Sequence, residues 1–200
     1  MSRTLILVTG LPGSGKSIIS EVVRGKEIPV VVMGDVVREE AVRRGVELLP
    51  ENLSIVANDL RKKYGKAAIA IFTSEKIREN HESSPVIVVD GVRSLDEIAV
   101  FEELGNVCII AVHASPYKRF ERIRQRGRPG DPSDWDQFLG RDLVELSWGI
   151  GNVIALADYI VVNESTIEEA KIQSEKVVEE VLKSGGRGCS RGRGKAYGRR

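Results

Sequence analysis

Short apolar runs, separated by longer stretches of mixed polarity, set the pattern of this chain. Within each run the apolar residues are continuous instead of alternating, which is typical of strands buried on both faces of a parallel sheet. The runs are rich in β-branched residues and cover 4–9, 29–33, 86–90, 107–112 and 158–162. They predict a parallel sheet with one strand for each run.

The stretches between the runs have the apolar spacing of helices. They cover 16–25, 36–44, 52–64, 67–79, 95–104, 116–126, 136–147 and 166–183. Candidate loops, marked by turn-forming residues, are 45–51, 80–85 and 127–134. Strands that alternate with helices indicate one doubly wound α/β domain, which we place at residues 1–183.

Charge is distributed unevenly along the chain. Residues 184–200 carry six Lys or Arg and no acid, which leaves 24 basic and 29 acidic residues in 1–183, a net charge of −5. This Gly-rich end is low in complexity and is predicted to be a disordered tail. A basic tail can contact nucleic acid or simply keep a protein soluble, and we favour the second interpretation.

The cysteine pattern and the apolar content indicate a cytoplasmic protein. Cys108 lies in an apolar run and Cys189 in the tail, so we expect them to stay unpaired, as in a reducing compartment. No run approaches the roughly 18 apolar residues needed to span a membrane. The apolar start, 5–8, is also too short for the core of a signal peptide.

Residues 10–17 read GLPGSGKS and match the phosphate-binding pattern G-x-x-x-x-G-K-[ST]. The match follows the first apolar run and precedes a helix-forming stretch, which is the context that the pattern requires. Its glycines let successive backbone N–H groups point inward as a nest for anions, and the next helix adds the positive end of its dipole. An ordinary Gly-rich turn into a helix is the alternative, which we disfavour.

Two side chains of this loop have separate expected roles. Lys16 reaches the β- and γ-phosphates, and Ser17 places its hydroxyl on Mg²⁺. ATP and Mg²⁺ are therefore the expected cofactors. The predicted nucleotide-binding residues are Gly10, Leu11, Pro12, Gly13, Ser14, Gly15, Lys16 and Ser17.

A second carboxylate, Asp90, ends the third apolar run. At the carboxyl end of a strand an acid can hold Mg²⁺ or its waters, so Asp90 and Ser17 form the predicted metal site. An Asp at a strand end is also common as a simple cap, but the phosphate loop favours the metal. Three residues further on, Arg93 lies near the sheet edge at which open α/β sheets bind ligands.

The segment GDVVRE, residues 34–39, follows the second apolar run and brings Asp35 and Arg38 to the same edge. Arg38 and Arg93 could form a clamp for an anionic group on a second substrate, and we prefer this role for Arg38 to an ion pair with Asp35. A solvated helix charge is the alternative for Arg38. Asp35 could cap the helix or accept a proton from an attacking hydroxyl.

An arginine-rich stretch, 115–142, is predicted to form a lid. On a helix Arg119, Arg122 and Arg126 share one stripe, and Arg141 follows on the next helix. Arginines stabilise the negative charge that spreads over a phosphoryl group during transfer, and a closing lid excludes water. A basic surface helix, or a contact with nucleic acid, is the alternative.

The order of these motifs resembles the nucleotide-kinase group of P-loop proteins, which includes adenylate kinase and dephospho-CoA kinase. The segments MGDVVREE, NDLRKKYG, VDGVRS, RPGDP and RDLVELSWGI most resemble a largely archaeal P-loop family related to dephospho-CoA kinase, over residues 3–180. The resemblance implies a three-layer αβα fold whose five-stranded sheet has the order 2-3-1-4-5. It also implies an acceptor-binding helical segment at about 36–84 and a lid at about 115–150.

Individual roles follow from the same resemblance. Arg38 and Arg93 match the arginines that grip the acceptor phosphate in adenylate kinases, and Arg122 and Arg126 match lid arginines. Asp35 matches the base that serves a ribose hydroxyl in dephospho-CoA kinases. The lid sequence RPGDPSDW departs from both groups, so the acceptor does not carry over. The predicted catalytic residues are Lys16, Asp35, Arg122, Arg126 and Arg141.

These observations favour a small-molecule kinase that transfers the γ-phosphate of ATP to a nucleotide-like acceptor, of the nucleoside monophosphate or dephospho-CoA class. The alternative is an NTP-binding regulatory protein or NTPase that associates with nucleic acid through the tail. A GTPase is disfavoured because no N-K-x-D motif is present, and a transporter ATPase because no L-S-G-G-Q segment is present.

Overall fold

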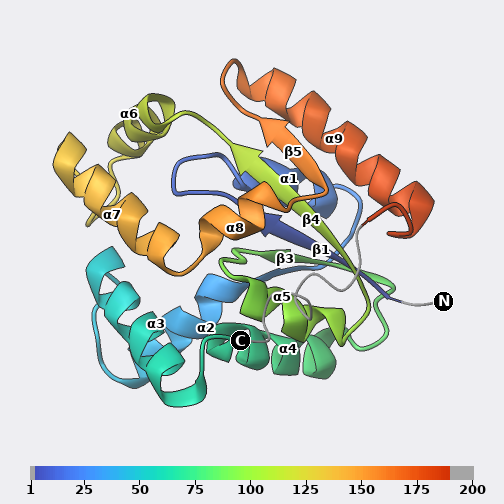
Figure 1. The fold of residues 1–200 in the computed structure, drawn as a ribbon, viewed down its shortest axis with the longest axis horizontal. Coiled ribbons are helices and arrows are strands. Elements are labelled where there is room, and N and C mark those ends of the chain that lie inside the picture. Colours follow the sequence, from blue (N-terminus) through green and yellow to red (C-terminus); the bar gives the residue numbers. More distant parts are fainter. Residues whose placement is uncertain (1–2, 190–200) are drawn as a thin grey trace.

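The computed structural model describes residues 3–189 and contains one sheet of five parallel strands (Figure 1). The strands lie in the order β2-β3-β1-β4-β5, and each neighbouring pair is parallel. Their bounds are β1 Thr4–Thr9, β2 Val30–Val32, β3 Val86–Asp90, β4 Asn106–His113 and β5 Tyr159–Val162. The predicted fold class and strand order are confirmed.

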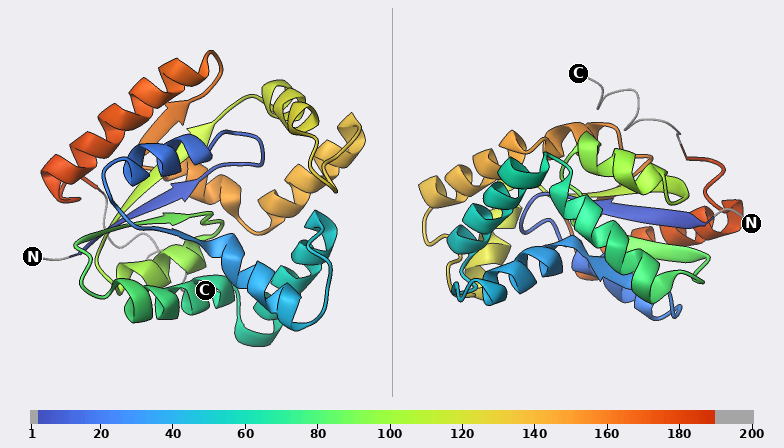
Figure 2. Two further views of the ribbon diagram at one scale, coloured as in Figure 1. Left: turned by 180° about the vertical axis from the view of Figure 1, so that it is seen from behind. Right: turned by 90° about the horizontal axis from the view of Figure 1, so that it is seen from below.

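Helices cover both faces of the sheet, so the domain has three layers. Their bounds are α1 Ser17–Arg24, α2 Met33–Arg43, α3 Pro50–Tyr64, α4 Ala68–His81, α5 Leu95–Glu102, α6 Pro116–Arg126, α7 Trp135–Ser147, α8 Ile150–Ala155 and α9 Ile167–Ser184. Helices α2, α3 and α7 gather beyond the carboxyl ends of the strands, opposite the end at which β1 begins (Figure 2). The functional site is therefore expected at that end.

The strand β1 divides the apolar core in two. Leu5 and Leu7 pack with residues of α2–α5 and α8, whereas Ile6 and Val8 pack with α1 and α9. All four side chains are fully buried. Successive side chains of a strand point to opposite faces, so a strand covered on both sides has to be apolar throughout.

The strand β2 ends, and the helix α2 begins, earlier in the chain than predicted. β2 ends at Val32, which pairs with Asp90, the last residue of β3. No strand partner continues beyond that pair, and the helix α2 begins at Met33 instead of residue 36. Asp35 therefore lies in the first turn of α2. The N-cap is Val32, and no side chain of residues 3–189 caps this helix, so of the two roles considered for Asp35 the cap is wrong.

Cys108 of β4 and Cys189 form a disulfide, with their Cα atoms 5.3 Å apart. Our expectation that they stay unpaired is wrong, and the argument for a reducing compartment that rested on it is withdrawn. After α9 the chain turns at Gly185 and Gly186, both with positive φ, and brings Cys189 against the core beside Cys108. The segment 184–189 thus packs against the domain instead of beginning a disordered tail.

The other residues of the predicted basic tail, 190–200, lie outside the described residues. Among residues 3–189, none of the helices is both long enough and apolar enough to cross a membrane.

Candidate functional site

The phosphate loop lies between β1 and α1. Gly13 and Gly15 have φ values of +82° and +98°, a region that residues with a Cβ rarely adopt. A Cβ on Gly13 would lie 2.7 Å from the backbone oxygen of Arg119, and one on Gly15 would lie 2.3 Å from the side-chain nitrogen of Asn163. The loop therefore needs glycine for both conformation and space. It leads directly into α1, so backbone N–H groups and a helix N-terminus converge where an anion would bind.

Lys16 is the charged side chain of this loop. Its Nζ donates a hydrogen bond to the backbone oxygen of Gly10 at 2.6 Å. Burial lowers the pKa of Lys16, while the negative charges of Asp90 and Glu145 oppose that shift. An ammonium group held in this way is poised to exchange a backbone oxygen for a phosphate oxygen.

Asp90 provides the carboxylate at the end of β3. Among the described residues, its buried Oδ1 has no hydrogen-bond partner. Burial raises the pKa of this carboxyl group, although the charges of Lys16 and Arg93 lower it. A buried carboxylate oxygen without a donor suits a hard cation or one of its water ligands. Asp90 and the exposed hydroxyl of Ser17 are thus the residues that could hold Mg²⁺.

A polar network that the sequence analysis missed supports the phosphate loop from β5. The side-chain amide of Asn163 donates to the backbone oxygen of Ser14 at 2.9 Å. Arg122 in turn donates from Nη2 to the backbone oxygen of Asn163 at 2.9 Å and to its Oδ1 at 3.1 Å. The buried Nη1 of Arg122 has no acceptor among the described residues, so it is available to a bound phosphate. The sequence signal for Asn163 was a polar residue just after an apolar run, as for Asp90.

Arg119 shares one face of α6 with Arg122 and Arg126, but it does not have the phosphate-stabilising role expected for that face. Its side chain is 3% exposed and forms a two-pronged ion pair with Asp142 of α7, at 2.8 and 2.6 Å. It also donates to the backbone oxygen of Pro12 in the phosphate loop at 3.2 Å. The prediction that Arg119 faces a ligand with Arg122 and Arg126 is therefore wrong: Arg119 ties the lid to the phosphate loop.

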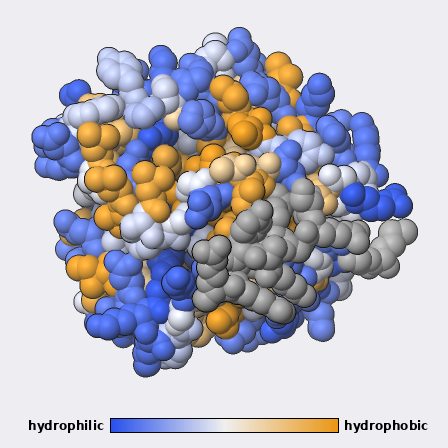
Figure 3. All heavy atoms as spheres, in the orientation of Figure 1, coloured by the Kyte–Doolittle hydropathy of each residue, from blue (hydrophilic) through white to orange (hydrophobic). Residues whose placement is uncertain are grey.

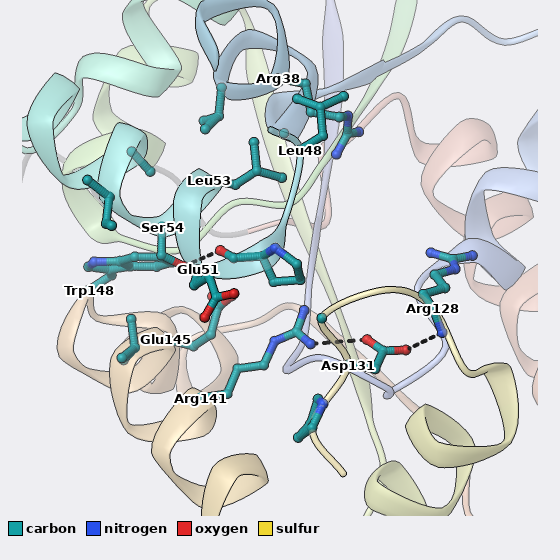
Figure 4. A pocket seen from close by; sticks show the side chains of 18 of the residues that line it. Arg38, Leu48, Glu51, Leu53, Ser54, Arg128, Asp131, Arg141, Glu145 and Trp148 are labelled. Atoms are coloured by element: carbon teal, nitrogen blue, oxygen red, sulfur yellow. Dashed lines mark hydrogen bonds and ion pairs between the residues drawn. The ribbon is translucent and has the colours of Figure 1, made fainter. Parts of the chain in front are cut away.

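A cavity of about 880 Å³ lies between α2 and α3 on one side and the lid loop and α7 on the other (Figure 4). Its walls carry many cationic side chains. The lining arginines are Arg38, Arg61, Arg93, Arg126, Arg128 and Arg141. The fold thus brings the predicted clamp residues Arg38 and Arg93 to the same cavity as the lid residues Arg126 and Arg141. Asp35 is not among the lining residues.

Arg38 forms the ion pair with Asp35 that we considered the weaker alternative. Its Nη2 lies 2.6 Å from Oδ1 of Asp35, and both side chains are about half exposed. Our preference against this pair is wrong for the ligand-free protein. An exposed pair of this kind contributes only about 0–1 kcal/mol, so a ligand phosphate can replace it at little cost.

Arg93 is held in place by a carboxylate that the sequence analysis did not single out. Its Nε donates to Oε2 of Glu145 at 2.6 Å, and its Nη1 donates to the backbone oxygen of Gly91 at 3.1 Å. Burial by itself would raise the pKa of Glu145, but the charge and hydrogen bond of Arg93 lower it. Glu145 therefore stays ionised and faces the cavity within electrostatic reach of Lys16.

Trp148 joins α3 to the end of α7. The guanidinium carbon of Arg61 lies 4.5 Å from the centre of the Trp148 ring, and the indole N–H donates to Asn58 at 2.8 Å. Arg61 also pairs with the fully buried Glu97 at 3.2 Å. A cation over an aromatic face and a paired charge fix this wall of the cavity.

The helix α7 has two unlike faces. Arg141 and Glu145 face the cavity, whereas Leu139, Leu143 and Leu146 are exposed on the outside. Apolar side chains are accordingly visible on the surface over this part of the molecule (Figure 3).

The protein has a kinase-like P-loop fold that binds nucleotides. Three features define it: a glycine loop that leads into a helix, a carboxylate at the end of a strand beside that loop, and an arginine-lined cavity. A family model described as an AAA domain matches residues 9–138. The UPF0200 protein of Hyperthermus butylicus is 55% identical over 183 residues, which span 92% of this chain and 97% of that protein. The UPF0200 protein of Methanocaldococcus jannaschii is 44% identical over 178 residues, which span 89% and 90% of the two chains. The chain belongs to the UPF0200 family.

Solved structures with low sequence identity share the fold. TT1252 from Thermus thermophilus matches with a TM-score of 0.62 at 18% identity, over 90% of this chain and 99% of that chain. Shikimate kinase from Bacteroides thetaiotaomicron matches with a TM-score of 0.53 at 17% identity, over 92% and 99%. A sugar kinase from Janibacter sp. matches with a TM-score of 0.54 at 14% identity, over 95% and 99%.

Proposed function

We propose that this protein is a small-molecule kinase that transfers the γ-phosphoryl group of ATP to a nucleotide-like acceptor in the cytoplasm. The observation that carries the proposal is the arginine-lined cavity between α2, α3 and α7. Its volume of about 880 Å³ is that of a ligand site, and its residues Arg93, Arg141 and Glu145 are electrostatically coupled to Lys16 of the phosphate loop. A simple hydrolase needs only water beside the γ-phosphate, whereas a kinase needs a second substrate site.

The donor side is supplied by the phosphate loop. Its backbone N–H groups hold the β- and γ-phosphates, and Lys16 adds a positive charge. Ser17 and Asp90 would hold Mg²⁺, which neutralises part of the phosphate charge when bound. Arg122 lies beside the loop and has an Nη1 without an acceptor among the described residues.

The acceptor side is supplied by the cavity. Arg38 and Arg93 bind an anionic group of the acceptor, and Arg126 and Arg141 stabilise charge on the transferred group. The acceptor oxygen forms a bond to the γ-phosphorus as the bond from that phosphorus to the bridging oxygen of ADP breaks. A hydroxyl acceptor also releases a proton to a carboxylate, for which Asp35 is the candidate, whereas a phosphate acceptor needs no base.

Several observations favour acceptors of the nucleoside monophosphate or dephospho-CoA class. Both classes carry phosphate groups that suit a cavity lined by arginines. Two of the structural neighbours are named as kinases, one for shikimate and one for a sugar, so this fold carries kinases of small acceptors.

The test is phosphoryl transfer from γ-labelled ATP to a panel of nucleoside monophosphates and dephospho-CoA. We expect one class to be labelled, and Lys16→Ala to reduce the rate by about 10³-fold, since it removes a charge that stabilises the transferred group. The matched control is Lys171→Ala, which removes an exposed lysine of α9. If ATP binds but every acceptor gives only slow hydrolysis, the kinase proposal fails and a regulatory NTP-binding protein takes its place.

A further inference from the structure

The carboxylate of Asp131 occupies the centre of the lid arginines. Its Oδ1 accepts from Arg126 Nη2 at 2.7 Å and from Arg141 Nη1 at 3.3 Å. Its Oδ2 accepts from Arg126 Nε at 2.7 Å and from the backbone N–H of Arg128 at 3.1 Å. Only 6% of the Asp131 side chain is exposed, although all of these residues line the cavity (Figure 4).

This set of donors would suit a phosphoryl group equally well. The guanidinium fork of Arg126 presents two parallel N–H groups, and such a fork binds carboxylate and phosphate oxygens in the same bidentate manner. A second guanidinium and a backbone N–H complete the site. The hydrogen bond and charge of Arg126 hold the pKa of Asp131 below its usual range, so the carboxylate is an anion.

The loop that carries Asp131 also closes the cavity. Gly127 and Gly130, both with positive φ, shape the turn between α6 and α7. A Cβ on Gly130 would lie 2.4 Å from a ring carbon of Pro50, so the loop rests against the start of α3. The ion pairs of Asp131 with Arg126 and Arg141 therefore hold this loop against α6 and α7, while Gly130 places it against α3.

We propose that the site formed by Arg126, Arg141 and the Arg128 N–H binds an oxyanion of phosphate or pyrophosphate. In the ligand-free protein the Asp131 carboxylate occupies the place of that oxyanion, so the ligand has to displace it. The identity of the natural ligand rests on the proposed function, but the anion site does not. Displacement of Asp131 also releases the loop between α6 and α7 from the two arginines, which couples anion binding to movement of that loop.

The opposite possibility is that Asp131 only orients the arginines for the ligand. The two roles predict opposite changes in ligand affinity when the carboxylate is removed. If the carboxylate competes with the ligand, the apparent dissociation constant is the intrinsic one divided by the fraction of molecules whose site is free. Removal of the carboxylate then strengthens binding. Removal of an orienting carboxylate weakens binding instead.

The experiment is calorimetric titration of inorganic pyrophosphate into the full chain and its variants. We expect Asp131→Asn to bind pyrophosphate about tenfold more tightly than the wild type. Asp131→Ser serves as a second variant, since serine also suits a turn, and far-UV circular dichroism checks that each variant is folded. Glu51→Gln is the charge-matched control: Glu51 lines the same cavity but, among the described residues, pairs with neither Arg126 nor Arg141.

Pyrophosphate can also occupy the phosphate loop, so the titrations are repeated with Lys16→Ala added to each protein. The gain from Asp131→Asn should persist there and should disappear when Arg126→Ala is added, because Arg126 supplies the bidentate fork. If the aspartate variants bind no more tightly than Glu51→Gln, or more weakly than the wild type, the proposal is overturned. The measurement needs no turnover, so a failure to find any acceptor would contradict the kinase proposal and leave this one standing.

Discussion

The phosphate loop and the arginine cavity present positive charge by different physical means. The loop uses backbone N–H groups and glycine conformations within eight consecutive residues, 10–17. The cavity uses side chains that meet across long stretches of chain: 52 residues separate Arg93 from Glu145, and 36 separate Arg61 from Glu97. The loop can therefore be recognised in the sequence, whereas the cavity depends on how distant helices are placed.

The two regions also differ in how their charges are balanced. Beside the loop, Asp90 keeps a buried oxygen that has no donor among the described residues, and the half-buried Lys16 donates only to a backbone oxygen. In the cavity, Arg38, Arg93 and Arg126 each pair with a carboxylate. The carboxylate beside the loop thus keeps an oxygen without a donor among the described residues, whereas the cavity pairs many of its charges internally.

The largest expected effect concerns Arg119, which links the two regions. Arg119→Ala leaves Asp142 charged and buried without its partner, which costs about 3–5 kcal/mol in the free energy of unfolding. Arg38→Ala is the matched control, because its exposed pair with Asp35 contributes about 0–1 kcal/mol. Urea denaturation measures both. Equal losses would show that burial does not distinguish these arginines.

The disulfide lies outside both regions, and its removal should lower the free energy of unfolding slightly less. Cys189→Ser removes the disulfide to Cys108, which closes a loop of 81 residues. We expect the free energy of unfolding to fall by about 2–4 kcal/mol. Because the bond lies in the core between β1, β4 and α9, ATP affinity measured by titration should not change. A parallel loss of ATP affinity would mean that this link also supports the phosphate loop.

The smallest effect is a pH dependence at the phosphate loop. The pKa of Asp90 is raised in the folded protein, above the ordinary value of 3.8, mainly by burial. Its contribution to stability is therefore fully present below pH 3.8 and is lost as the pH rises through the folded pKa. Asp90→Asn should make the nucleotide-free protein more stable at pH 7 and give no gain below pH 3.8.

Urea denaturation at several pH values would measure this effect. Asp136→Asn, which neutralises an exposed acid of α7, is the control and should show no such gain. If Asp90→Asn is less stable than the wild type at pH 7, the charge of Asp90 is not a burden on the folded protein, and the prediction is wrong.

The sheet was predictable because its signal is local. Five continuous apolar runs, each bounded by turn residues, marked the strands, and alternation with helices determined their parallel arrangement. The helix α8 was missed because it has only six residues and starts after Gly149, where a turn was equally plausible. The start of α2 was misplaced because the apolar residues of β2 continue into the helix, and only the length of β3 decides where pairing ends.

The site was predictable in part for the same reason. Lys16, Ser17 and Asp90 follow strand ends in recognisable patterns, and the fold brings Arg38, Arg93, Arg126 and Arg141 to one cavity. The sequence analysis missed three residues: Asn163, which supports the phosphate loop, Glu145, which holds Arg93, and Asp131, which pairs with Arg126 and Arg141. Each acts through a partner on another element of the fold.

The amino-acid sequence by itself determined the parallel sheet, the phosphate loop and the arginine-rich helix after β4. These features rest on local properties: strand polarity, glycine conformation and helical spacing. The tertiary structure alone decided which arginines are structural, which carboxylates neutralise the cavity and that Cys108 meets Cys189. The physical reason is that a buried charge or thiol is defined by its neighbours in space, and helix packing sets those neighbours.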